Sequence, residues 1–122
     1  MAAPPARPAG AGSPAALSYF LIESKGNWSG PGAGAFLRDA EALAGAGHRV
    51  RVYLVEDGVL SAAGAAAREI ERLAEAGVEV LVDDFSAAQR AVGGTLSPHV
   101  RLAGMETVAA ALAEDDCRGV WH

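Results

Sequence analysis

Short apolar runs alternate with amphipathic segments along this chain, and the alternation predicts its fold. Three runs are rich in β-branched and aromatic residues and carry few charges, as strands buried on both faces of a sheet do. They span residues 17–23, 48–55 and 78–82. Two shorter runs, over residues 99–103 and 117–122, predict a short fourth strand and a final fifth strand.

The segments between these runs have apolar residues at helical spacing on one face and charged residues on the other. They predict helices over residues 33–46, 63–76 and 105–115, and a further helix that begins at Asp83 or Asp84 and extends to about residue 92. In the last helix we expect Met105, Val108, Ala109 and Leu112 to face inward. Strands that alternate with helices through short connections form parallel sheets with right-handed crossovers. The sequence therefore predicts an α/β fold, a three-layer α/β/α sandwich around a mainly parallel five-stranded sheet.

Composition narrows the class of protein further. The 122 residues suit one domain, which we place at residues 17–122, after an Ala/Pro-rich segment 1–16 expected to be a disordered tail. The formal charge of −5, without a basic run, argues against nucleic acid as a partner. No apolar run approaches the length of a membrane helix. The single cysteine, Cys117, excludes an internal disulfide and fits the reducing cytoplasm.

Three stretches in this order resemble the DsrE/DsrF-like family of small sulfur-relay proteins, which includes the TusD type. The first helix ends in Ala-Gly-His-Arg-Val50, and the second strand continues as Val-Tyr-Leu-Val-Glu-Asp-Gly-Val-Leu60. The third strand passes into Phe85-Ser-Ala-Ala-Gln-Arg90. The resemblance covers residues 17–122 and implies a three-layer domain that assembles as a trimer or hexamer, homomeric or mixed.

The resemblance also implies a cysteine at the end of the third strand, which passes a persulfide sulfur along a relay. This chain has Asp83, or by a shift of one residue Asp84, at that place. A carboxylate cannot hold a persulfide. The chain thus resembles a divergent member that lacks the family cysteine.

Ligands of open parallel sheets bind outside the carboxyl ends of the strands, so the residues there are the candidate ligand-binding set. Carboxylates follow three strands, and together they predict an acidic rim able to attract a cation or to perturb one another's ionisation. At least one carboxylate after the third strand has the alternative role of helix cap. The carboxylates are Glu23, Glu56, Asp57, Asp83 and Asp84.

The loop after the first strand adds Lys25, Asn27 and Trp28, and the helix after the third strand adds Phe85. A tryptophan in such a loop can cover a ligand or anchor a subunit contact, or simply pack. The glycines at residues 30–34 do not complete a nucleotide-binding pattern, and we expect no cofactor.

Cys117 is the one candidate catalytic residue. The adjacent Asp115 and Asp116 disfavour its thiolate form, so a buried structural thiol is the alternative. His99 and His122 could act as bases, but no histidine or cysteine at metal-ligand spacing accompanies either, and we expect no metal site.

Three functions follow. The favoured one is a DsrE-like binding or assembly subunit without catalysis of its own, a homo-oligomer that binds a protein partner in sulfur transfer. The second is a sulfurtransferase or sulfur carrier that uses Cys117. The third is an acidic-rim metal- or anion-binding protein.

Overall fold

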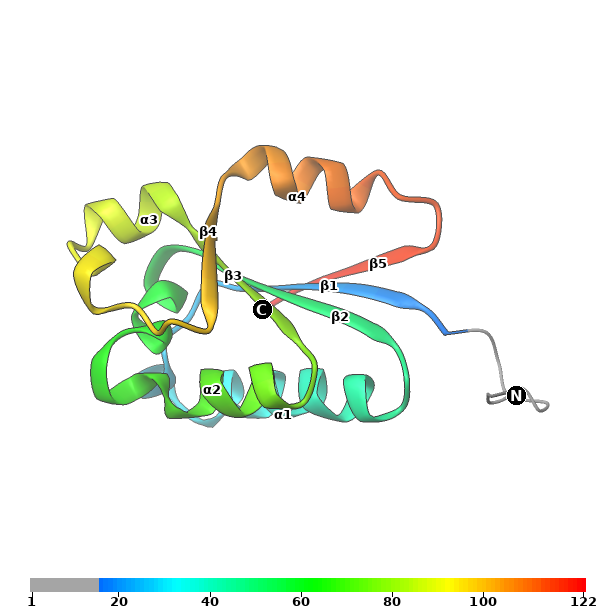
Figure 1. Cartoon of the computed structure of the whole chain (residues 1–122), viewed down its shortest axis with the longest axis horizontal. Helices are drawn as coiled ribbons and strands as arrows, with labels where there is room; N and C mark the ends of the chain where they lie inside the picture. Colours follow the sequence, from blue (N-terminus) through cyan, green and yellow to red (C-terminus); the bar gives the residue numbers. More distant parts are fainter. Residues whose placement is uncertain (1–15) are drawn as a thin grey trace.

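The computed structural model describes residues 16–122, except the side chain of Asn27, and shows an α/β sandwich (Figure 1). The proposed tail lies almost wholly outside the described residues. Five strands form the sheet: β1 (Ser18–Glu23), β2 (Arg49–Leu54), β3 (Glu79–Asp83), β4 (Val100–Ala103) and β5 (Cys117–Trp121). Their order is β4-β3-β2-β1-β5, and every neighbouring pair is parallel. The fold class predicted from the sequence is confirmed, and β4 and β5 are the edge strands.

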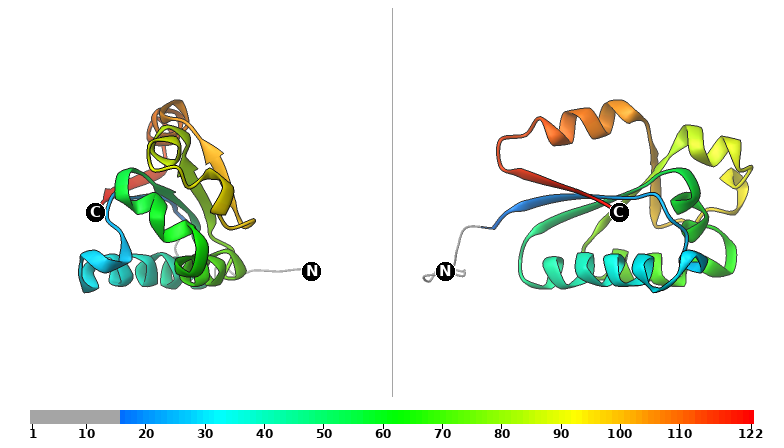
Figure 2. Two further views of the ribbon diagram at one scale, coloured as in Figure 1. Left: turned by 90° about the vertical axis from the view of Figure 1, so that its left-hand side faces the viewer. Right: turned by 180° about the vertical axis from the view of Figure 1, so that it is seen from behind.

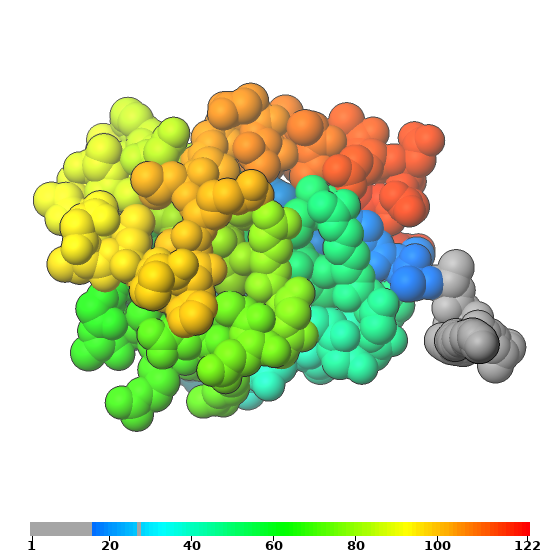
Figure 3. All heavy atoms as spheres, in the orientation of Figure 1, coloured from blue at the N-terminus to red at the C-terminus, as the bar shows by residue number. Residues whose placement is uncertain are grey.

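Helices cover both faces of this sheet (Figures 1 and 2). The α1 helix (Pro31–Gly45) and the α2 helix (Arg68–Glu75) lie on one face, and α3 (Asp84–Gln89) and α4 (Met105–Leu112) lie on the other. Successive residues of a strand point to opposite faces, so each strand feeds two cores. Leu21, Val52 and Val80 pack beneath α1 and α2, whereas Phe20, Tyr53 and Leu81 pack beneath α4. In the space-filling view the edge strand β4 lies on the face of the molecule turned toward the viewer (Figure 3).

The helix predicted over residues 63–76 is not α-helical in its first part, so that part of the prediction is wrong. Two 3-10 helices, η2 (Glu56–Ala62) and η3 (Gly64–Ala67), precede α2, which begins only at Arg68. Ala63 is extended and forms an isolated antiparallel bridge with Leu96, and Gly64 has a φ of 57°. A residue in the left-handed region after an extended residue interrupts an α-helix. The prediction failed here because the segment is rich in alanine, which favours helix in isolation.

Two other helices are shorter than predicted. The α3 helix ends at Gln89, because Ala91 has a φ of 54° and two glycines follow in η4 (Gly93–Thr95). The α4 helix ends at Leu112, and its buried residues are Val108 and Ala111. The prediction that Met105, Ala109 and Leu112 face inward is wrong, since all three residues are exposed, Met105 to 54% and Leu112 to 47%. The α4 helix reaches out over the edge strand β5, where Leu112 lies against Gly119.

None of the helices over residues 16–122 combines the length and apolar character needed to cross a bilayer.

Candidate functional site

Asp83, at the end of β3, is buried and is the N-cap residue of α3. Asp83 is 4% exposed and precedes the first residue of α3. Its Oδ2 accepts hydrogen bonds from the backbone N–H of Ser86 at 2.9 Å and from the Ser86 hydroxyl at 2.7 Å. Its Oδ1 accepts from the hydroxyl of Tyr53 on β2, at 2.5 Å. Both oxygens are therefore engaged, and the structure confirms that Asp83 caps the helix.

These contacts set the ionisation of the pair. Burial alone would raise the pKa of Asp83, but the hydrogen bonds from Tyr53 and Ser86 outweigh burial and hold that pKa below its usual value. Burial, together with the hydrogen bond to the Asp83 carboxylate, raises the pKa of the Tyr53 hydroxyl well above its usual value. Asp83 is therefore a carboxylate and Tyr53 a neutral phenol at neutral pH.

The lowered pKa of Asp83 predicts acid sensitivity. Because the folded pKa lies below the unfolded value of about 4, the stabilising contribution of the carboxylate is complete above about pH 5 and is lost as the pH falls below about 4. We expect the free energy of unfolding to decline less steeply with acidification in Asp83→Asn than in the wild type. Urea unfolding followed by circular dichroism between neutral and acidic pH measures both slopes. Equal slopes would contradict this assignment.

A second buried carboxylate lies at the end of β1. Glu23 is fully buried, and its Oε1 and Oε2 both lie 3.0 Å from Nδ1 of His122, directly after β5. The backbone N–H of Lys25 also donates to Oε2, at 3.0 Å. The His122 ring stacks on Phe36 of α1, with ring centroids 5.2 Å apart. Strand order creates this pair, since β5 lies beside β1 although the two residues are 99 positions apart.

The predicted carboxylates do not gather into one acidic rim. In the sheet register Glu23 pairs with Leu54, and Leu54 with Val82, so Glu23 points to the α1/α2 face whereas Asp83 points to the other. Asp57 is exposed and pairs with Arg90 at 3.0 Å. Within residues 16–122 as described, no three His, Cys, Asp or Glu side chains come together as a metal site would require.

The remaining predicted ligand-binding residues are mostly solvent-exposed. Trp28 lies in the 3-10 helix η1 (Asn27–Ser29) and is 59% exposed, and Phe85 is 67% exposed. Lys25 and Asp84 are exposed as well, as is Glu56. Asn27 also belongs to η1, but its side chain lies outside what the structure describes. These residues therefore form a solvent-exposed surface at the end of the sheet where the carboxyl ends of the strands lie, which we call the carboxyl edge.

Cys117 lies at the opposite, amino-terminal edge of the sheet. It begins β5 and pairs with Ser18 of β1. Its half-buried Sγ lies 3.8 Å from Nη2 of Arg51, which is itself 7% exposed and bonded to Glu114 at 2.9 Å. The sequence neighbours of Cys117 on its amino-terminal side are acidic, Asp115 and Asp116. Arg51 is missed because it reaches the thiol from β2, across β1.

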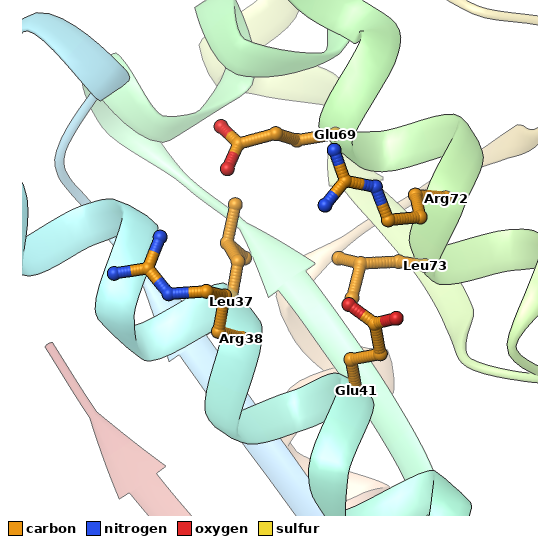
Figure 4. A pocket seen from close by; sticks show the side chains of 6 residues that line it. All are labelled: Leu37, Arg38, Glu41, Glu69, Arg72 and Leu73. Carbon is orange, nitrogen blue, oxygen red and sulfur yellow. The ribbon is translucent and has the colours of Figure 1, made fainter.

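A shallow hollow between α1 and α2 carries a mixed set of charges (Figure 4). Leu37 and Leu73 form its floor, and it has room for about one water molecule. The charged residues around it are Arg38, Glu41, Glu69 and Arg72. It suits contact between two helices better than ligand binding.

Solved structures share this fold. The crystal structure of the YchN protein from E. coli matches with a TM-score of 0.75 at 16% identity, over 84% of this chain and 98% of YchN. The structure of MTH1491, a protein of unknown function from Methanobacterium thermoautotrophicum, matches with a TM-score of 0.72 at 13% identity, over 88% of this chain and all of MTH1491. No protein-family model matches the chain, and no curated protein is similar to it in sequence. At these identities the likeness shows the fold alone, and it supports the DsrE-like fold that the sequence resemblance implied.

Proposed function

We propose that this chain is a DsrE-like binding and assembly subunit that carries no persulfide at the end of β3. The observation behind the proposal is the state of Asp83, whose two oxygens are both bonded to buried neighbours. A carboxylate held in this way supports the fold and offers no sulfur chemistry. The chain would then be a divergent member in which the family position has become structural.

The proposed ligand surface is the carboxyl edge of the sheet. Exposed Trp28 and Phe85 offer apolar contacts there, and Lys25 and Asp84 offer charge. Aromatic residues of this kind anchor interfaces with other molecules. We propose a protein partner in sulfur transfer as the occupant, and no catalysis by this surface itself.

Assembly is the other half of the proposal. Both edge strands present unpaired backbone groups, and β5 also exposes Val120 and Trp121, the latter 66% exposed. Proteins protect such edges by covering them. We propose a homo-oligomer, a trimer or hexamer as in the family that the sequence resembles.

Sedimentation velocity tests this assembly. We expect the purified chain at micromolar concentration to sediment as three or six copies. A Trp121→Ser variant, which removes the most exposed apolar side chain of β5, is expected to shift the population toward monomer, and Phe85→Ser serves as a matched exposed aromatic on another element. A wild-type monomer would overturn the assembly half of the proposal.

A sulfur carrier that uses Cys117 is the second candidate. One observation favours it: the guanidinium of Arg51 lies within 3.8 Å of Sγ, and a neighbouring cation stabilises a thiolate. Glu114 offsets part of that charge. A sulfur adduct on Cys117 would favour this candidate over the first.

A further inference from the structure

The outer side of the edge strand β5 carries unpaired backbone groups in a defined order. The N–H of His122 donates to the carbonyl of Ile22, and the carbonyl of His122 accepts from the N–H of Ser24, so this residue bonds to the β1 side. Alternate residues of a strand bond to opposite sides, so Gly119 and Trp121 direct both their backbone groups outward. Because β5 ends the sheet, no strand within residues 16–122 lies beside these four groups.

The side chains around these groups are apolar and exposed. Trp121 is 66% exposed, Val120 43%, and Leu112 of α4, which lies against Gly119, 47%. By the sheet register, Gly119 and Trp121 point to the face that α4 covers and Val120 points to the face that α1 covers. Proteins keep edge strands from pairing with charged side chains or a covering segment, and β5 has one charged residue, Arg118.

We propose that β5 pairs antiparallel with β5 of a second copy of this chain, about a two-fold axis at Val120. In this register Gly119 of each copy lies opposite Trp121 of the other. Each such pair exchanges two backbone hydrogen bonds, so the contact uses all four outward groups of each copy. The two five-stranded sheets would then join into one continuous sheet. The inference rests on the proposed function in taking the chain to be a homo-oligomer, and it identifies the contact.

The apolar side chains complement one another in this register. On the α4 face, Trp121 lies opposite Gly119 of the second copy, and an aromatic residue opposite an edge glycine covers the place where a side chain is missing. Leu112 of that copy borders the same position. On the α1 face, Val120 meets Val120 of the second copy in a direct cross-strand pair.

The charges complement one another as well. Arg118 is exposed and has no ion-pair partner in the part of the chain that the structure describes. In the proposed register it lies opposite His122 of the second copy. The buried carboxylate of Glu23 is next in the same row, because His122 lies beside Glu23 in the sheet. The contact thus brings an unpaired cation toward a buried carboxylate.

A second copy fits this edge better than the chain's own first residues. That segment contains prolines at positions 4, 5, 8 and 14, and proline has no N–H to donate to the outward carbonyls of β5. A two-fold contact joins copies in pairs. Within the proposed assembly it therefore selects the hexamer, because an isolated trimer cannot be built from such pairs.

A disulfide at the two-fold axis tests the register. In the full chain carrying Cys117→Ala, Val120→Cys places two cysteines directly opposite each other, about 4.5 Å apart between Cα atoms, which a disulfide can span. Oxidised glutathione is the oxidant: two protein thiols become one disulfide, and two molecules of glutathione are released. Intact mass measures the covalent dimer.

Two control variants separate this contact from random collision. Arg118→Cys lies on the same strand and face, but the two copies of it would be about 13 Å apart along the strands. Leu102→Cys is an exposed position on the other edge strand, β4. We expect Val120→Cys to form dimers about tenfold faster or more than either control, since assembly raises the effective concentration of its thiols. Circular dichroism confirms that each variant folds.

Hydrogen exchange tests the same contact in the unmodified chain. The amide of Val120 bonds to β1 in a single copy and should be protected at any concentration. The amides of Gly119 and Trp121 should exchange about tenfold more slowly or more in the assembled chain than in the diluted chain. Residue-resolved mass spectrometry measures these rates. Unprotected Gly119 and Trp121 amides in the assembled chain would overturn the proposal.

The outcomes decide separately from those of the proposed function. Equal dimer formation by Val120→Cys and its two controls, in a chain that sediments as a trimer or hexamer, would overturn the β5 contact and leave the assembly standing. Fast dimer formation by Val120→Cys in a wild type that sediments as a dimer would uphold the contact and overturn the trimer or hexamer.

Discussion

Replacing Gly58 with alanine is expected to destabilise the fold by about 3 kcal/mol or more. A Cβ at this position would lie 2.2 Å from the backbone carbonyl oxygen of Glu23, far inside contact distance. Backbone at the end of a central strand cannot yield as a flexible side chain does. The η2 segment would have to withdraw from the end of β1, where the Glu23–His122 pair is held.

Urea unfolding of wild type and variant measures this loss. The matched control is Gly93→Ala, since Gly93 also lies in a 3-10 helix and an added Cβ there would meet no atom within 4 Å. The control should be neutral or stabilise by up to about 1 kcal/mol, because alanine restricts the unfolded chain. If Gly58→Ala were as stable as Gly93→Ala, the close approach of η2 to β1 would be wrong.

Replacing Asp83 with alanine is the second large effect, again about 3 kcal/mol of lost stability. The substitution removes the cap of α3, and it leaves the Tyr53 hydroxyl and Ser86 buried without their acceptor. A lost cap costs about 1 kcal/mol, and each unsatisfied buried polar group about 1–3 kcal/mol.

The neighbouring carboxylate is the control for this prediction. Asp84 lies in the first turn of α3 and is exposed, so Asp84→Ala should cost less than about 1 kcal/mol. Chemical denaturation of the two single variants compares them directly. Similar losses in both variants would mean that Asp83 stabilises the fold no more than its neighbour does, and would contradict its assignment as a buried structural cap.

Local pattern was enough to predict the layers of this fold. The apolar runs that become β1, β2 and β3 and the carboxylate that caps α3 are all features of neighbouring residues. The start of α2 was not predictable in this way, because Ala63 leaves the helix to bridge Leu96, 33 positions away. Helix propensity depends on neighbouring residues and carries no information on such a tertiary contact.

The candidate site depended on information that the residue pattern does not contain. Glu23 was identifiable as a carboxylate after a strand, but its partner His122 was not. Only the insertion of β1 between β2 and β5 brings them together. The same strand order brings Arg51 to Cys117, which the sequence placed among acidic residues alone. The pairing register of the strands also shows that Glu23 and Asp83 face opposite sides of the sheet, so the predicted acidic rim does not form.

The proposed function requires that this chain carries no persulfide sulfur. Intact mass measured after incubation with a cysteine desulfurase and cysteine tests it most directly, with Cys117→Ala treated in parallel. We expect the wild type and the variant both to keep their unmodified masses, while Cys117 of the wild type still reacts with an alkylating agent. One or more added sulfur atoms on the wild type, absent from Cys117→Ala, would overturn the proposed function and make this chain a sulfur carrier that uses Cys117 beside Arg51.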